Sequence, residues 1–529
     1  MANLNKIGVV GAGTMGSGIA LAALYANLHV TLYDISPEVL GRAREYIEKF
    51  LSRKDKAENL QILVTTQTLE DLAGSDVVIE AAPEDLEIKH ELFARLDEIC
   101  PPPAILASNT STLSVTRIAS AVKQPGRVAG MHFFNPAPVL PLVEVIRAAQ
   151  SSPDTIQTLM QLAEMMGKTP LVASDTPGFI VNRVARPFYG ESLRLLGEGV
   201  ATHAQIDRIV REGGEFRMGP FELMDLIGLD VNFSAVQSVY EQNFYEPRFR
   251  PHLIQHQMVA QNALGRKTGR GFYDYREPQA QGKENRISLD INQKSGTVLL
   301  AAGDWAPGLL DLCERAGYPV EAFEGAANTI GAEQNFDVGV LASGSSQGLR
   351  VHLNEMERAI PEDLPILCQS VDTSLIEIAT WMDHPERLVG FDGLFLYNGK
   401  VATAVASPVL TEEARNRVEN FLQNLERDVI WVEDSPALVL PRIVCMLVNE
   451  ASFAVGEGVA EPETIDQAMK LGVNYPHGPL EWGEKIGYAH VIAVLDHLHA
   501  ECGEERYRVA PWLRKQERLS SIHQTKQQK

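Results

Sequence analysis

Two apolar, strand-like segments of the chain each carry one ionisable residue. The run "RVAGMHFF" contains His132, and the following run "PLVEVI" contains Glu144. Histidine titrates where a base that takes a hydroxyl proton near neutral pH must titrate. A carboxylate beside an imidazole can hold the ring in one orientation and stabilise its protonated form. We therefore expect His132 and Glu144 to meet across a sheet edge and to act as a general-base pair.

A glycine-rich loop near the N-terminus has the pattern of a nucleotide-binding site. The stretch "VVGAGTMGSGIA" places Gly11, Gly13 and Gly16 between a predicted strand and a predicted helix that begins with Thr14 and Met15. In a dinucleotide site the first glycine permits a tight turn, the second lets the pyrophosphate approach the backbone, and the third lets the helix pack on the sheet. The helix N-terminus faces the phosphate charge. The pattern predicts a dinucleotide-binding loop.

Asp34 ends the next predicted strand and favours NAD over NADP. A carboxylate at this place can bind ribose hydroxyls, whereas it would repel a 2′-phosphate. The adjacent "YDISPE" supplies no arginine to bind such a phosphate. Together with the glycine loop, Asp34 favours dehydrogenase chemistry for His132 and Glu144 over a hydrogen-bonded core histidine and a solvated glutamate.

The elements that must position these residues follow an α/β plan. Residues 1–175 alternate strand-like apolar runs with amphipathic helical runs, which is typical of a parallel sheet in a Rossmann-type domain. The predicted strands are "KIGVVG", "HVTLYD", "DVVIEAA", "AILASN", "RVAGMHFF", "PLVEVI" and "PLVAS". After Asp175 the β-branched runs stop, and residues 176–285 are predicted to form an all-α domain. Within it, "GFIVNRVARPFYGESLRLLGEG" predicts one long apolar helix, and the polar "REPQAQGKENR" predicts a linker at its end.

The second half of the chain repeats this plan in a degenerate form. Residues 434–487 match residues 175–228 without a gap, and residues 387–406 resemble residues 127–146. We therefore expect a degenerate Rossmann-like domain over 286–433 and a second all-α domain over 434–529.

The residue types that could do chemistry are absent from this copy. Gapless alignment places Asp392 at His132, Ala404 at Glu144 and Pro441 at Asn182. The copied glycine loop carries Ala301 and Ala306 at the first and third glycines, and Ser345 stands at Glu84. We expect one active site and one NAD for each chain.

Composition narrows the class of protein. At 529 residues the chain is too long for one core. The net charge of −22 argues against nucleic acid and anionic membranes as partners. No apolar run approaches the roughly 20 residues of a membrane span, and "MANLNKIGVV" leaves no room for a signal peptide. The 5 cysteines lack C-x-x-C spacing, so we expect a cytoplasmic protein without a zinc site or disulfide framework.

Several motifs closely resemble the L-3-hydroxyacyl-CoA dehydrogenase family over the range from Lys6 to Tyr275. They are "GAGTMGSGIA", "SNTSTL", "HFFNPAPVLPLVEV", "DTPGFIVNR", "MGPFEL" and "GRKTGRGFYDY". The resemblance implies that His132 is the general base and Glu144 its partner. It also implies that Ser111 and Asn182 hold the substrate oxygens and the imidazole.

The same resemblance implies a set of binding residues. It assigns further positions to the NAD pocket, which are Glu84, Lys89, Ser111, Asn135 and Lys267. It assigns the basic segment "RKDKAEN" to the CoA phosphates, through Arg53, Lys54 and Lys56. For any one of these basic residues, a solvated helix end is an equally good explanation. No metal ion is implied.

The resemblance also implies an activity, which is oxidation of a 3-hydroxyacyl-CoA to the 3-ketoacyl-CoA with NAD. The long chain is similar to the bacterial enzymes of this family that act on 3-hydroxybutyryl-CoA or on the 3-hydroxyadipyl-CoA of phenylacetate breakdown. No crotonase-like segment accompanies it, so we expect neither hydratase nor isomerase activity. Because the all-α domain is the dimer interface in shorter members, the second copy predicts an internal pseudo-dimer of α-domains. The sequence leaves open whether whole chains form a homo-oligomer.

Two other functions compete with this interpretation. One is a two-domain β-hydroxyacid dehydrogenase that acts on a non-CoA acid, but such enzymes use a lysine base, and "HFFNP" followed by "LVEV" disfavours it. The other is a non-catalytic NAD-binding scaffold. The complete set of His132, Glu144, Ser111 and Asn182 argues against a scaffold.

Overall fold

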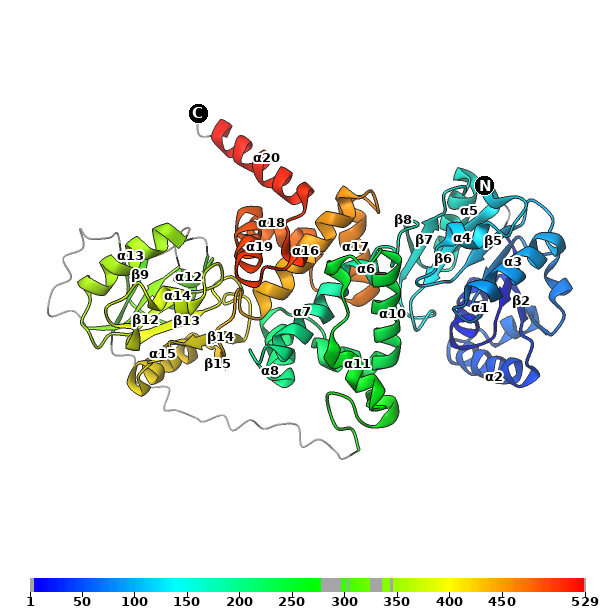
Figure 1. The fold of residues 1–529 in the computed structure, drawn as a ribbon. Helices are drawn as coiled ribbons and strands as arrows, with labels where there is room; N and C mark the ends of the chain where they lie inside the picture. The colour runs from blue at the N-terminus through cyan, green and yellow to red at the C-terminus, as the bar shows by residue number, and fades with distance from the viewer. Residues whose placement is uncertain are drawn as a thin grey trace. The chain divides into compact units, whose positions relative to one another are not determined.

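The N-terminal part of the chain folds around an eight-stranded sheet (Figure 1). Its strands lie in the order β3-β2-β1-β4-β5-β6-β7-β8, and within this sheet β6 and β7 are the one antiparallel pair. The bounds are β1 (Lys6–Val10), β2 (His29–Tyr33), β3 (Leu63–Thr66), β4 (Val77–Glu80), β5 (Ile105–Ser108), β6 (Val128–Phe133), β7 (Leu142–Arg147) and β8 (Thr169–Ser174). The predicted Rossmann-type sheet is confirmed, and β3 is the strand that the sequence pattern missed.

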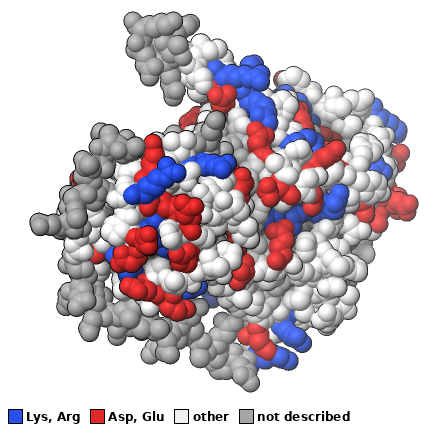
Figure 2. All heavy atoms as spheres, turned by 60° about the vertical axis from the view of Figure 1, so that its left-hand side comes forward, with Lys and Arg blue, Asp and Glu red and all other residues white. Residues whose placement is uncertain are grey.

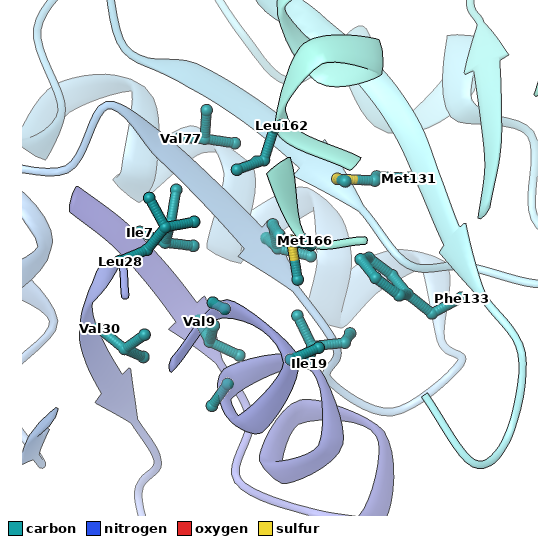
Figure 3. Close-up of a cluster of buried hydrophobic side chains, with 14 of the residues drawn as sticks. Ile7, Val9, Ile19, Leu28, Val30, Val77, Met131, Phe133, Leu162 and Met166 are labelled. Carbon is teal, nitrogen blue, oxygen red and sulfur yellow. The ribbon is translucent and has the colours of Figure 1, made fainter. Parts of the chain in front are cut away.

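Crossover helices join the parallel strands, as parallel pairing requires. They are α1 (Thr14–Tyr25), α2 (Pro37–Arg53), α3 (Leu86–Ile99), α4 (Val115–Ala119) and α5 (Pro153–Met165). One face of the sheet packs against α1 and α5 in a cluster of buried apolar side chains, part of which Figure 3 shows. Met131 and Phe133 belong to this cluster. Since successive side chains of a strand point to opposite faces, His132 points to the other face.

Helices follow the first sheet. They are α6 (Val181–Val184), α7 (Arg186–Gly197), α8 (His203–Arg208), α9 (Pro220–Ile227), α10 (Leu229–Gln242) and α11 (Leu253–Ala260), with a π-helical turn η4 (Ile209–Gly213) after α8. The single long helix predicted over residues 178–199 is wrong, because the chain breaks between α6 and α7.

A second, seven-stranded sheet repeats the strand order of the first. Its order is β10-β9-β11-β12-β13-β14-β15, and here β13 and β14 form the one antiparallel pair. The strands are β9 (Thr297–Ala301), β10 (Val320–Ala322), β11 (Phe336–Leu341), β12 (Ile366–Gln369), β13 (Leu388–Phe391), β14 (Val401–Ala406) and β15 (Asp428–Val432). Helices α12 (Leu309–Arg315), α13 (Ser346–Ala359), α14 (Leu375–Ala379) and α15 (Glu412–Asn424) accompany them.

A second run of helices ends the chain. It comprises α16 (Leu440–Gly456), α17 (Pro462–Val473), α18 (Pro479–Ile486), α19 (Tyr488–Cys502) and α20 (Pro511–Gln527). Helix α17 packs on β7, β8 and α6, although more than 270 residues separate it from α6 in the sequence. A late segment of the chain thus joins the N-terminal sheet.

The structure, a computed structural model, describes residues 4–276, 296–301, 303, 305–323, 335–342 and 346–527. These form two units. The first holds residues 4–184, 241–244 and 454–478, and the second holds 185–240, 245–453 and 479–527. Most of the predicted linker, and Ser345, lie outside the described residues.

Charge and chemistry of the surface agree with an ordinary globular protein. On the face drawn in Figure 2, acidic side chains gather in several groups with basic side chains between them. In the part of the chain that the structure describes, no helix is long and apolar enough to cross a bilayer, and no group of three His, Cys, Asp or Glu side chains is arranged to hold a metal ion. Four of the free cysteines are buried, and Cys502 is exposed.

Candidate active site

The glycine loop joins β1 to α1 at the carboxyl edge of the sheet. A Cβ atom at Gly11 would lie 2.6 Å from the carbonyl oxygen of Ala81, and one at Gly16 would lie 1.7 Å from the carbonyl oxygen of Gly11. Gly11 also has a φ of 92°, which side chains rarely adopt. At Gly13, by contrast, nothing lies within 4 Å of where a Cβ would be. The first and third glycines are needed by the fold itself, whereas the second leaves open space beside the backbone.

Helix α1 presents an uncapped N-terminus to this space. Gly13 is the N-cap, no side chain caps the helix, and its first turn holds no acidic residue. The first N–H groups of a helix, here those of Thr14 and Met15, lack intrahelical acceptors and carry a partial positive charge. Together with the open side of Gly13, they fit a pyrophosphate.

Asp34 follows β2 and is tied to the same loop. Its Oδ2 accepts a hydrogen bond from the N–H of Ala12 at 2.8 Å, and its Oδ1 accepts one from the N–H of Ser36 at 2.9 Å. A carboxylate offers about four acceptor sites, so two further bonds can still form. Asp34 therefore sits beside the dinucleotide loop, half-buried, with capacity left for ribose hydroxyls.

Glu84 organises the loop after β5. Its Oε1 accepts hydrogen bonds from backbone and hydroxyl groups of residues 110–112, at 2.7 to 3.3 Å. Burial would raise the pKa of this carboxyl, but Lys89 and these hydrogen bonds outweigh burial, and the pKa lies below its usual value. The Lys89 ammonium is 1% exposed and lies 2.6 Å from Glu80 and 3.4 Å from Glu84. Lys89 thus lies beneath the loop and holds it through two carboxylates.

His132 and Glu144 lie directly opposite each other on β6 and β7. The Nδ1 atom of His132 is 2.7 Å from Oε2 of Glu144. Both side chains are buried, with 5% and 0% of their surface exposed. The pair lies inside the sheet, because β8 flanks β7, and not at the sheet edge that we expected. Among the described residues, none hydrogen bonds to the other ring nitrogen, Nε2, so the ring is held from one side only.

The backbone and rings around the pair restrict both side chains. Oε1 of Glu144 accepts hydrogen bonds from the N–H groups of Ile180 and Val181, each at 3.0 Å. The imidazole packs against the rings of Phe134 and Phe179, with centroids 4.6 Å and 5.9 Å away. Phe179 has a φ of 48°, a strained value for this residue type. The turn before α6 therefore delivers both the donors for Glu144 and a wall for the imidazole.

The remaining two candidate catalytic residues meet nearby. The side-chain amide of Asn182, on α6, donates a long hydrogen bond of 3.4 Å to the carbonyl oxygen of Ser111. Ser111 is half-buried in the loop that Glu84 organises. The fold thus brings Ser111, Asn182 and the buried pair onto segments that contact one another.

The other predicted cofactor residues lie at two places. Asn135 is exposed in the loop just after β6. Lys267 belongs to the second unit, where its ammonium pairs with the carboxylate of Asp230. Asn135 therefore lies three residues past the histidine, while Lys267 lies in a separate unit.

The predicted basic segment wraps the end of α1. The guanidinium of Arg53 lies over the ring of Phe50, and the ammonium of Lys54 lies 4.8 Å from the ring centroid of Tyr25. Lys56 donates to the carbonyl oxygen of Tyr25 at 2.6 Å. Lys56 therefore caps a helix end, while Arg53 and Lys54 keep charged heads at the surface.

Two positioning residues were missed at the sequence level. Lys168 donates to the carbonyl oxygens of Ala137 and Leu140 at 2.6 and 2.8 Å, and so fixes the loop after β6. Burial and the neighbouring Lys54 lower the pKa of Lys168 to about 8. Asp175 accepts from the N–H groups that begin α4, and thereby fixes the segment after Ser111. The "DTPG" motif contained Asp175, whereas no pattern in the sequence singled out Lys168.

Comparison with known families accounts for this arrangement. The model of the 3-hydroxyacyl-CoA dehydrogenase NAD-binding domain matches residues 6–176, and the model of the C-terminal domain matches residues 178–275 and again 438–529. The 3-hydroxyadipyl-CoA dehydrogenase of Escherichia coli K12 is 37% identical over 99% of this chain and 100% of its own length. The chain belongs to the 3-hydroxyacyl-CoA dehydrogenase family. It is an NAD-dependent oxidoreductase.

Further members of the family match the whole chain or its first half. The crystal structure of 3-hydroxybutyryl-CoA dehydrogenase from Escherichia coli K12 covers 99% of this dehydrogenase and 100% of that chain, with a TM-score of 0.81 and 36% identity. A probable 3-hydroxybutyryl-CoA dehydrogenase of Bacillus subtilis is 43% identical over 52% of this chain and 98% of its own length. The first half alone thus corresponds to a whole protein in another organism.

The described residues of the second sheet carry no comparable pair, and the register of β13 and β14 corrects one alignment. Strand β14 pairs Gly390 with Val405 and Phe391 with Ala404, so Asp392 lies opposite Thr403. The N–H of Asp392 donates to the carbonyl oxygen of Thr403. The structural counterpart of Glu144 is therefore Thr403, and the gapless assignment to Ala404 is wrong. The loop between the two strands is one residue shorter than in the first sheet, and one residue changes the face of a strand.

The loop after β9, which aligns with the glycine loop, contains a buried tryptophan. Trp305 is 3% exposed, and its ring packs edge-on against His490 with centroids 4.4 Å apart. A Cβ atom at Gly393 would lie 2.4 Å from the carbonyl oxygen of Trp305. Residues 302 and 304 of this loop lie outside the described residues. The described part of the loop contrasts with the open space beside Gly13.

Proposed function

We propose that this dehydrogenase oxidises the 3-hydroxyl group of a short or dicarboxylic (S)-3-hydroxyacyl-CoA, with His132 as the general base. The observation that carries the proposal is the buried pair of His132 and Glu144. One ring nitrogen of His132 is bound by the carboxylate, while Nε2 has no partner among the described residues. That nitrogen is the one that can take a proton from a substrate.

The proposed oxidation needs one acceptor for the hydroxyl proton and one acceptor for the hydride. The hydroxyl proton goes to Nε2 of His132, the O–H electron pair becomes part of the new C=O bond, and the C3–H electron pair leaves as hydride. NAD bound at the glycine loop supplies the hydride acceptor. Glu144 stabilises the imidazolium, because its Oε2 faces the Nδ1–H group. Two backbone donors hold the carboxylate in place, so it does not turn away when the charge on the ring changes.

Ser111 and Asn182 are proposed to hold the substrate. The Ser111 hydroxyl and the Asn182 amide can donate to the 3-oxygen as negative charge builds up during oxidation. Their support is the contact between the two segments and the bracing of the Ser111 loop by Glu84. Thr14, Met15 and Asn135 are proposed to contact the cofactor, and Lys89 to act from beneath the loop.

Two binding preferences are part of the proposal. Asp34 should select NAD over NADP, since its carboxylate stands where a 2′-phosphate would lie. Arg53 and Lys54 are proposed to attract the CoA phosphates with their surface charges. Lys56 is a weaker candidate, because its ammonium already binds a helix end. A role of Lys267 in NAD binding is proposed from the family resemblance alone.

The acyl group is best tested with a panel of substrates. Relatives that match the full length are named for 3-hydroxyadipyl-CoA and 3-hydroxybutyryl-CoA, which differ in acyl-chain length and in a distal carboxylate. Turnover with 3-hydroxybutyryl-CoA, 3-hydroxyadipyl-CoA and the matching free acids should favour the CoA thioesters. Faster turnover of the free acids would support the β-hydroxyacid dehydrogenase alternative. If none of these substrates is turned over, the non-catalytic NAD-binding scaffold is the remaining alternative.

We also propose that the second half is a degenerate copy, with domains over 1–175, 176–285, 286–433 and 434–529. Equivalent contacts in the two halves support it. Asp175 binds the first N–H groups of α4, and Asp434 binds those of α14 in the same way. Calorimetric titration should therefore find one NAD for each chain, and two equivalent sites would contradict the proposal.

An internal pair of helical domains is the proposed reason for keeping the copy. Within the second unit, the buried Arg442 of α16 binds Glu191 on α7 and Glu198 just after α7, and the hydroxyl of Tyr507 donates to Glu191. Buried charges of this kind need their partners, so each helical segment supports the other. The cytoplasmic location stays a prediction, and the oligomeric state of whole chains stays open.

A further inference from the structure

A segment of the second half lies against the part of the first unit that holds Glu144. Residues 454–478, which include α17, pack on β7, β8 and α6. The sequence of this segment contains none of the proposed catalytic residues. Its contacts nevertheless reach the three elements that hold the catalytic carboxylate, since Glu144 lies on β7 and its backbone donors lie at the start of α6.

Polar contacts hold residues 454–478 against the end of β8 and against α6. The N–H of Ser174, at the end of β8, donates to the carbonyl oxygen of Val459, and its hydroxyl donates to that of Gly458. Arg183 on α6 lies 2.7 Å from Oε2 of Glu457. The side chain of Arg183 is 2% exposed, whereas that of Glu457 is 46% exposed. Glu457 thus reaches from the surface to a buried cation that is two residues beyond Val181.

An apolar contact completes the support. A Cβ atom at Gly472 would lie 2.8 Å from Cδ2 of Leu142 and 3.1 Å from Cγ2 of Val181. Leu142 is two residues before Glu144 on β7, and the N–H of Val181 is one of its two backbone donors. Interiors pack closely enough that a single methyl group is felt. Glycine at position 472 lets α17 contact both Leu142 on β7 and Val181, whose N–H group donates to Glu144.

We infer that Glu457 and Gly472 are positioning residues for Glu144, so that the half without a catalytic pair sets the geometry of the half that has one. The inference rests on the proposed roles of His132 and Glu144. The chain of contacts runs from Glu457 through Arg183 to α6, and from α6 through two backbone hydrogen bonds to the carboxylate that orients the imidazole.

The second unit supplies matched controls. Glu198 binds Arg442 there, as Glu457 binds Arg183 in the first unit. A Cβ atom at Gly213 would lie 3.3 Å from Val401 and 3.4 Å from Leu440, as the corresponding atom at Gly472 would meet Leu142 and Val181. The control contacts lie at the starts of β14 and α16, and the described residues of the second sheet hold no imidazole–carboxylate pair. Variants of Glu198 and Gly213 therefore lose an equivalent contact that does not support Glu144.

Hydrogen exchange in the full-length enzyme tests the inference without any need for turnover. Glu457→Gln and Gly472→Ala should speed exchange at the amides of residues 180 and 181 by about 2- to 30-fold, the usual range for mutations along a coupled network. Glu198→Gln and Gly213→Ala should speed exchange near residue 440 and leave residues 180 and 181 unchanged. Unchanged exchange at 180 and 181 in both Glu457→Gln and Gly472→Ala would overturn the inference.

Kinetics separate positioning from a general loss of structure. Glu457→Gln and Gly472→Ala should lower kcat by about 2- to 30-fold, while the Kd of NADH stays within about twofold because the glycine loop is untouched. Glu457→Asp, which keeps the charge, should recover part of the lost rate. An equal loss in the two controls, or a loss that appears only as weaker NADH binding, would count against positioning. If the wild-type enzyme fails to turn over acetoacetyl-CoA with NADH, the proposed function fails, and the exchange result still decides whether α17 holds the anchor of Glu144.

Discussion

The antiparallel strand pairs β6–β7 and β13–β14 hold corresponding places in the two sheets but carry different side chains. In the first, His132 and Glu144 face each other, and two backbone donors fix the carboxylate. In the second, Asp392 faces Thr403, and the carboxylate of Asp392 instead accepts from the N–H groups of the loop that follows it. Burial raises the pKa of Asp392 to about 7. A similar antiparallel strand pair therefore supports a hydrogen-bonded imidazole and carboxylate in one place and a loop cap in the other.

The comparison separates what the sheet supplies from what the site needs. The sheet supplies burial and adjacency, which both halves have. The site also needs a second group that bears the opposite charge when the first is protonated, because an isolated buried charge is costly. Glu144 meets this need for His132, while Asp392 has no cation facing it across the strands. The predictions below would break or sharpen this contrast.

Removing the second half should have the largest effect. A chain of residues 1–285 keeps every proposed catalytic residue but loses α16 and α17, and so exposes apolar surface at a cost of about 25 cal/mol per Å². We expect an insoluble or newly dimerising fragment, as judged by light scattering after size-exclusion chromatography. A monomeric fragment with normal turnover would show that the first half does not need the second.

Removing the base should abolish most of the rate. His132→Gln should lower kcat by about 10²- to 10⁴-fold, the range for losing general acid–base catalysis, with NADH affinity nearly unchanged. Steady-state kinetics with acetoacetyl-CoA and fluorescence titration with NADH measure the two quantities. Asp392→Asn serves as the control in the second sheet and should leave kcat unchanged. Near-normal turnover of folded His132→Gln would remove this residue from the mechanism.

The cofactor preference should follow from one carboxylate. We expect kcat/KM to favour NADH over NADPH by about 10²-fold or more, because facing a 2′-phosphate with Asp34 costs several kcal/mol. Asp34→Ala should narrow the ratio, although it also removes the hydrogen bond to Ala12 and so weakens the loop. Equal kcat/KM values for the two cofactors in the wild type would show that Asp34 does not face the ribose.

The smallest effect concerns stability in the second sheet. Since burial raises the folded-state pKa of Asp392 to about 7 from the ordinary 3.8, the folded state holds the proton more tightly than the unfolded state. Its contribution to stability is therefore most favourable below about pH 4 and is lost as the pH rises toward 7, by at most about 4 kcal/mol. Asp392→Asn keeps an acceptor for the loop and removes the charge, so it should raise the Tm at pH 8 more than at pH 5. Cys445, the neighbouring thiol, stays neutral over this range because burial raises its pKa. Equal Tm changes at both pH values would mean that Asp392 is not buried as a neutral acid.

Much of the fold and the site could be predicted from local patterns. Seven of the eight strands of the first sheet and the glycine loop lie where alternating apolar runs and the G-x-G-x-x-G spacing indicated. The missed strand β3 is short and half-exposed, and such strands have weak patterns. The long helix over residues 178–199 was wrong because the apolar pattern continues through the break between α6 and α7. The alignment of Ala404 with Glu144 was wrong because it allowed no gap in the loop between the two strands. A gap was indicated by the sequence, since the matched stretches that begin at residues 127 and 387 are one residue further apart than those that begin at 175 and 434.

The sequence by itself determined which side chains are available, namely a glycine loop open at Gly13, an acid after the second strand, and a histidine and a glutamate on successive strands. Only the tertiary structure decided how they act together. Cross-strand register made His132 and Glu144 direct neighbours, and the turn before α6 brought two N–H groups to the carboxylate. Contacts between residues such as Arg183 and Glu457, 274 positions apart, have no local signature, because chain folding rather than sequence spacing brings them together.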